Sequence, residues 1–152
     1  MSDFNTIEAA LNYAIAMEQA AVDLYTEFAE RAQTEAMKEA FLAIAQEERG
    51  HKAKLAAAKS GARPLAGASE TVQDLKIADY TSDVDLAKNP SYADILVFAM
   101  QQEKHAFRLY TDLAARTDDQ ALKQLFLALA QDEAKHKLRF EVEYDQQVLS
   151  EN

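Results

Sequence analysis

Apolar side chains recur at intervals of three or four residues along four stretches of this 152-residue chain. Such spacing places them on one face of an α-helix, whereas a half-buried strand would show strict alternation. The four stretches predict helices at approximately residues 5–32, 35–59, 91–117 and 120–146. Because few glycines and prolines interrupt them, we expect an all-α chain.

Polar residues with helix-capping character precede three of these stretches. Asn5 followed by Glu8, and Ser91 followed by Asp94, have the spacing of a capping box, in which two side chains satisfy backbone amides reciprocally. Thr34 is suited to cap the second helix. We therefore predict N-caps at residues 5, 34 and 91.

The second half of the chain repeats the first at a distance of 85 residues, so that residues 35–48 resemble residues 120–133. A short turn inside each half predicts two antiparallel helical hairpins. Glycine and proline gather at residues 60–90, which we interpret as a long crossover, with a short helix as one option, that lets both hairpins join one four-helix bundle. We expect a single domain over residues 1–152.

Two Glu-x-x-His motifs and two further glutamates interrupt the apolar faces. The six residues are Glu18, Glu48, His51, Glu103, Glu133 and His136. Members of each motif are three residues apart and so share a helix face. Glu18 lies 16 residues before Thr34 and Glu48 lies 14 after it, so an antiparallel hairpin brings them to nearly the same height. The second half repeats this relation, and we predict one layer of six side chains.

A layer with four buried carboxylates requires positive charge, because each uncompensated buried anion costs several kcal/mol. No lysine or arginine lies on these predicted faces at that level, so an internal salt-bridge cluster is disfavoured. Two divalent cations would balance four carboxylates, and two imidazoles would complete an oxygen and nitrogen ligand set that suits iron or manganese. We therefore predict a dinuclear metal centre.

Tyr25 and Tyr110 each follow a predicted ligand by seven residues and share its helix face. One interpretation is core packing with a satisfied hydroxyl; the other is that both phenols line an oxidant pocket or hydrogen-bond the ligand carboxylates. His105 lies about 200° around the helix from Glu103 and is expected to face solvent. Gly50, inside the first motif, is compatible with close approach of another helix.

Composition narrows the possible partners. Sixteen lysines and arginines against 26 aspartates and glutamates give a net charge of −10, which disfavours nucleic acid and anionic lipid. No apolar run approaches the roughly 20 residues that span a bilayer, and no basic and then apolar segment begins the chain. The absence of cysteine excludes internal disulfides and cysteine-ligated metal sites. We expect a soluble, cytoplasmic protein without nucleic acid or membrane partners.

At the six candidate ligands the chain resembles the rubrerythrin branch of the ferritin-like superfamily, over essentially its whole length. Glutamates on two helices and Glu-x-x-His on two others are an established pattern of that superfamily. The resemblance implies a ferritin-like four-helix bundle, two iron ions, reaction of the reduced site with hydrogen peroxide or dioxygen, and a homodimer. Manganese or a mixed-metal centre is compatible with the same ligands. By motif position the bridging ligands would be Glu48 and Glu133, and the terminal ligands Glu18, His51, Glu103 and His136.

Two features depart from the rubrerythrin pattern. Rubrerythrins commonly add a rubredoxin domain with four cysteines, so in this cysteine-free chain we expect electrons from a separate, rubredoxin-like donor. They also usually carry a further glutamate three residues after the third-helix ligand, where this chain has Ala106. That glutamate is associated with redox-linked movement of one iron. The remaining ligand set is more symmetric and closer to bacterioferritin-type sites.

Three functions remain as alternatives. The first is a non-haem di-iron oxidoreductase that reduces hydrogen peroxide under oxidative stress, and the resemblance favours it. The second is a ferroxidase or iron-handling protein that oxidises Fe(II) with dioxygen or peroxide, and Ala106 favours it. The third is a helical interaction protein whose metal is structural and does not turn over.

Overall fold

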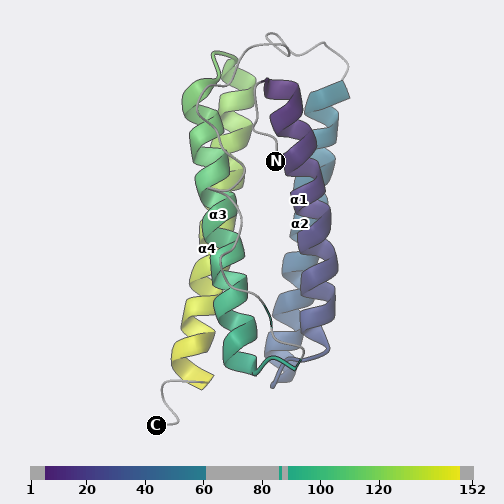
Figure 1. Cartoon of the computed structure of the whole chain (residues 1–152), viewed down its shortest axis with the longest axis vertical. Helices are drawn as coiled ribbons and strands as arrows, with labels where there is room; N and C mark the ends of the chain where they lie inside the picture. The colour runs from purple at the N-terminus through teal and green to yellow at the C-terminus, as the bar shows by residue number, and fades with distance from the viewer. Residues whose placement is uncertain (1–5, 61–85, 87–88, 148–152) are drawn as a thin grey trace. The chain divides into compact units, whose positions relative to one another are not determined.

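A computed structural model of the protein describes residues 6–60, 86 and 89–147. Its four helices are α1 (Ile7–Ala29), α2 (Glu35–Ser60), α3 (Tyr92–Arg116) and α4 (Gln120–Gln147) (Figure 1). The described residues contain no strand, and the predicted all-α class is confirmed. No helix in these ranges combines the length and the apolar character needed to cross a membrane.

Side-chain caps start the helices. The Thr6 hydroxyl accepts a hydrogen bond from the amide three residues further on, at 3.1 Å, so Thr6 is the N-cap of α1 and the prediction of Asn5 was wrong. Either residue type can satisfy an amide that has no partner inside the helix. Thr34 accepts the corresponding bond at 3.1 Å, and Ser91 forms a capping box with Asp94, which confirms both predicted caps.

Helix α1 ends at Ala29, three residues earlier than predicted. The amides of Glu30, Arg31 and Ala32 donate to carbonyls three residues back, at 3.0 to 3.4 Å, instead of four residues back. This tighter bonding satisfies the last carbonyls of the helix and turns the chain. Apolar periodicity does not reveal such a change, because the side chains keep nearly the same spacing.

The chain divides into two compact units, one that contains α1 and α2 and another that contains α3 and α4. Within each unit the two helices lie side by side as a hairpin (Figure 1). Stacked rings join the helices at repeat-related positions: Tyr25 and Phe41 lie 6.2 Å apart, and Tyr110 and Phe126 lie 6.3 Å apart, between ring centroids. The sequence repeat is therefore a structural repeat. Almost all of the predicted crossover at residues 60–90, with its optional short helix, lies outside the described residues.

The buried face of α3 differs from its predicted position. Phe107 follows Glu103 by four residues but is 39% exposed, whereas His105, expected to face solvent, is only 8% exposed. Leu109, one turn after His105, is fully buried. The buried face of α3 therefore extends to the side of the helix that carries His105 and Leu109. The prediction for His105 was wrong because a single stripe through Glu103 does not define the width of an apolar face.

A buried tyrosine and glutamate pair joins α3 to α4. The Tyr92 hydroxyl donates to Oε2 of Glu143 at 2.7 Å, and both side chains are buried. Desolvation, reinforced by this hydrogen bond, raises the pKa of Tyr92. Tyr144, the next residue along α4, is half-buried, so Glu143 and not Tyr144 lies on the buried face. Glu143 lies seven residues after His136, a spacing that puts it on the ligand face.

Removing the Tyr92 hydroxyl should destabilise the second hairpin, because Glu143 would stay buried without this donor. We expect Tyr92→Phe to lower the free energy of unfolding by about 1 to 3 kcal/mol, measured by urea denaturation. The double variant Tyr92→Phe with Glu143→Leu removes both polar partners and should regain part of the loss. A Tyr92→Phe variant as stable as the wild type would contradict this account.

Gly50 does not serve close helix packing. It is exposed, and a Cβ atom at this position would meet no atom within 4 Å, so that interpretation was wrong. We expect Gly50→Ala to raise the free energy of unfolding by about 0.5 to 1 kcal/mol, because alanine loses less backbone entropy in a helix. Ala53→Gly, at an exposed position of the same helix, is the matched control and should lower it by a similar amount. Loss of stability in Gly50→Ala would refute the assignment of open space.

Candidate metal centre

In the first hairpin, Glu18 of α1 meets Glu48 and His51 of α2. Nδ1 of His51 lies 3.3 Å from Oε2 of Glu18 and 3.0 Å from Oε1 of Glu48. Each of the three residues is at most 2% exposed, and one ligand atom from each lies within 4.8 Å of the others. The predicted equal height of Glu18 and Glu48 is confirmed, because side chains from both helices reach one buried point.

The second hairpin builds the same group from Glu103 of α3 and from Glu133 and His136 of α4. Nδ1 of His136 lies 3.2 Å from Oε2 of Glu103 and 3.2 Å from Oε1 of Glu133. All three residues are buried, and one ligand atom from each again lies within 4.8 Å of the others. The structure thus brings the six sequence-predicted residues together in two sets of three, one in each hairpin.

Apolar neighbours keep water away from these groups. Ala14 and Val22 lie one turn before and one turn after Glu18 on α1, and both are buried. On α2, Ile44 and Leu55 lie one turn outside the Glu48 and His51 motif, and both are buried. Because the helical period places the ionisable groups on the same face as these apolar side chains, both lie in the same buried interior. An anion in such surroundings is costly unless a positive charge compensates it.

A proton on His51 can supply this positive charge when no metal is present. Burial acts to lower the pKa of His51, but hydrogen bonds to Glu18 and Glu48 and attraction to both carboxylates raise it to about 10. The proton on Nδ1 then stands where a cation would sit between two carboxylates. A divalent metal would take the same three donor atoms and displace the proton. Oxygen and imidazole donors of this kind fit iron or manganese.

Tyr25 and Tyr110 belong to the packed interior of their own hairpins. Both are fully buried, and their rings are nearly parallel to those of Phe41 and Phe126, at interplanar angles of 18° and 17°. This stacking agrees with the core-packing interpretation. Their predicted contribution at an oxidant pocket stays a prediction.

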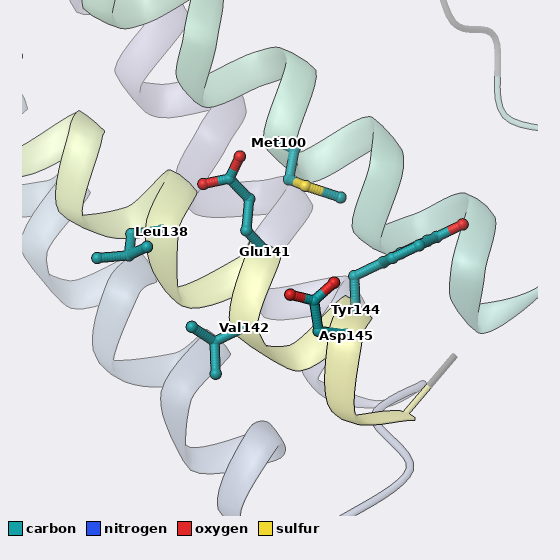
Figure 2. Close-up of a pocket in the computed structure, with 6 residues that line it drawn as sticks. All are labelled: Met100, Leu138, Glu141, Val142, Tyr144 and Asp145. Carbon is teal, nitrogen blue, oxygen red and sulfur yellow. The ribbon is translucent and has the colours of Figure 1, made fainter. Parts of the chain in front are cut away.

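A hollow on the surface of the second hairpin has a different character (Figure 2). Met100 lines it from α3, and α4 contributes Leu138, Glu141, Val142, Tyr144 and Asp145. None of these residues is buried, and Glu141 forms an ion pair with Lys137 at 2.7 Å. No desolvated ionisable group lines the hollow. Among the described residues, the two buried groups of glutamate and histidine are therefore the better candidates for a functional site.

Comparison with known proteins connects both hairpins to one family. The Rubrerythrin family model matches residues 9–86 and 94–152, which include all six predicted ligands. A solved structure of a hypothetical protein from Pyrococcus furiosus is 25% identical, with a TM-score of 0.69, and the match covers 92% of this chain and 89% of that chain. No curated protein matches the chain. The family match confirms the predicted fold class, a ferritin-like four-helix bundle built from two repeated hairpins.

The raised pKa of His51 should make the stability of the metal-free protein depend on pH. The folded state favours the charged imidazole, so this stabilisation is complete below the ordinary pKa of 6.5 and is lost as the pH rises through about 10. We expect the free energy of unfolding to fall across this window by at most about 1.4 kcal/mol per pH unit. Urea denaturation in the presence of a chelator measures it. His51→Gln should show a shallower fall, and a slope equal to that of the wild type would rule out the assignment.

Proposed function

This chain belongs to the Rubrerythrin family, and from that premise we propose that it is a non-haem di-iron oxidoreductase that reduces hydrogen peroxide. Two electrons from a separate donor and two protons would convert each peroxide into two waters. The observation that carries the proposal is the buried group of two glutamates and one histidine in each hairpin. Four carboxylates and two imidazoles are the ligand types that a pair of iron ions takes in ferritin-like proteins.

In this proposal the protein provides preorganised ligands that are shielded from water. The glutamates and histidines of both hairpins would hold iron, which when bound would pass the electrons of the separate donor to peroxide, and the carboxylates would offset the charge of the metal. His51 and His136 direct Nδ1 toward the carboxylates of their own hairpins, so each imidazole is aligned before metal binds. A ligand set held in this way needs little rearrangement when metal arrives. We further propose that Tyr25 and Tyr110, two turns along the helix from Glu18 and Glu103, support the ligands from the protein interior.

Oxidation of Fe(II) is the second candidate function, and Ala106 favours it. Ala106 is 4% exposed and follows Glu103 by three residues, which is the position of the additional glutamate in rubrerythrins. An alanine offers no ligand there. The proposed centre would resemble the more symmetric sites of bacterioferritins, which supports a ferroxidase or iron-handling activity with dioxygen or peroxide.

The partners that we propose follow from the same family. They are hydrogen peroxide or dioxygen as oxidant, a rubredoxin-like protein as electron donor, and a second copy of the chain in a homodimer. We propose a separate donor because these 152 residues contain no cysteine that could hold a rubredoxin-type iron.

Metal analysis followed by rapid mixing tests the proposal. Protein purified without added metal should contain iron, at about two ions per chain when fully loaded. The protein loaded with Fe(II) under anaerobic conditions should then be oxidised faster by hydrogen peroxide than by dioxygen, as followed by stopped-flow absorbance. His136→Ala is the control and should lower the iron content.

The opposite results identify the alternatives. Faster oxidation by dioxygen, with repeated turnover of added Fe(II), would replace peroxide reduction by ferroxidase activity. Slow reaction with both oxidants, together with a large loss of stability on chelation, would indicate a structural metal. If the wild-type protein contains no iron or other divalent metal and does not take any up, the assignment of the metal site is wrong.

A further inference from the structure

We propose that the surface of the second hairpin beside Glu103 and His136 is the docking site for the separate electron donor, and that this donor presents an acidic face. The inference rests on the proposed function, because it presumes that electrons reach metal bound by these ligands. It goes beyond that function by assigning to the donor a surface of this chain and a sign of charge.

Three basic side chains gather next to the second set of candidate ligands. Lys104 and Arg108 are exposed and lie one turn apart on the same face of α3. Lys137, on α4, is partly exposed. Lys104 directly follows Glu103 in sequence, and Lys137 directly follows His136. A partner bound to these three residues, which we call the basic patch, would therefore lie beside two of the candidate ligands.

The first hairpin has no such patch at the corresponding positions, which carry Gln19, Asp23 and Lys52. There the Lys52 ammonium donates to Gln19 at 2.7 Å, and the Gln19 amide donates to Asp23 at 3.0 Å. The lysine and the aspartate offset each other's charge. Lys52 thus reaches the neighbouring helix, and because the hairpin is repeated, Lys137 lies opposite Lys104 in the same way.

Most of the charge of the basic patch is uncompensated by the described residues. Neither Lys104 nor Arg108 forms an ion pair within residues 6–60, 86 and 89–147. At one end of the patch, Glu141 pairs with Lys137 at 2.7 Å, and at the other, Asp112 lies one turn beyond Arg108. Because the chain has a net charge of −10, its overall field repels an acidic partner, whereas this patch attracts and orients one.

Apolar side chains lie among these charges. Phe107 is 39% exposed and Leu138 is 60% exposed, whereas Val22, which corresponds to Phe107 in the first hairpin, is buried. Met100, one turn before Lys104, lines the surface hollow together with Leu138 (Figure 2). An apolar centre with a charged rim is the usual composition of a protein interface. The rim would steer the donor, and the apolar side chains would hold it.

A second copy of this chain is a poorer occupant of the same surface. In a two-fold symmetric dimer centred on the basic patch, the patch would face itself. Lys104 and Arg108 would then lie opposite like charges, which is unfavourable. A different protein with an acidic face avoids this repulsion.

Binding to the metal-free protein tests the surface without any redox reaction. The probe is zinc-substituted rubredoxin of net negative charge, which cannot pass electrons, titrated into the isotope-labelled chain at low ionic strength. We expect amide chemical shifts to change around the basic patch and the changes to disappear as salt is added. Changes confined to other residues, or no binding at low ionic strength, would overturn the proposal.

Matched variants test the link to electron transfer. Lys104→Gln combined with Arg108→Gln removes two charges from the patch, and Lys38→Gln combined with Lys54→Gln removes two from exposed positions of α2. Each iron-loaded, oxidised protein is mixed with reduced rubredoxin in a stopped-flow instrument. We expect the patch variant to be reduced at least about fivefold more slowly than the wild type and the control to stay within about twofold. Equal rates for the two variants would overturn the proposal.

Two further measurements separate the possible failures. Iron analysis and circular dichroism of each variant check that the ligands and helices are retained. Sedimentation that shows a wild-type dimer, but a monomer for the patch variant, would assign the surface to a second copy and overturn the proposal. Wild-type protein that binds no iron would instead refute the proposed function, while the titration with zinc-substituted rubredoxin would still decide the docking surface.

Discussion

Burying carboxylates inside a helical hairpin is the constraint on which the rest of this structure depends. An anion deprived of water must be paired with positive charge, and Glu18 and Glu48 are paired in the first hairpin with an imidazole whose Nδ1 lies close to both. The arrangement needs two antiparallel helices with a fixed register, because a shift of one residue would rotate a ligand off the shared face by about 100°. The stacked rings of Tyr25 and Phe41 hold that register from within the core.

Much of the helical structure was accessible from sequence because its determinants are local. The apolar period marks the four helices, and a short turn places Glu18 level with Glu48 without knowledge of any other contact. The equality of the two halves follows in the same way from the shift of 85 residues. These inferences need only the rise and twist of an α-helix, which vary little between proteins.

The wrong predictions concern features that depend on distant parts of the chain or on competition between neighbours. Two adjacent polar residues could both cap α1, and the structure uses Thr6. His105 lies about 200° around α3 from Glu103 and so outside the expected stripe, where burial depends on what packs there. Glu143 was overlooked because a helical glutamate is usually solvated. Its partner Tyr92 is 51 residues away in sequence, so only the paired register of α3 and α4 reveals it.

The Tyr92 and Glu143 pair gives the two hairpins unequal resistance to opening. It lies at the start of α3 and near the end of α4, away from the turn between them, whereas the repeat-related positions of the first hairpin carry Ile7 and Ala58. A hydrogen bond buried at the open end must break before those helix ends can fray. Backbone amides there should exchange with solvent deuterium more slowly than those at the start of α1 and the end of α2. Although both hairpins carry the same candidate ligands, the first hairpin should therefore open before the second.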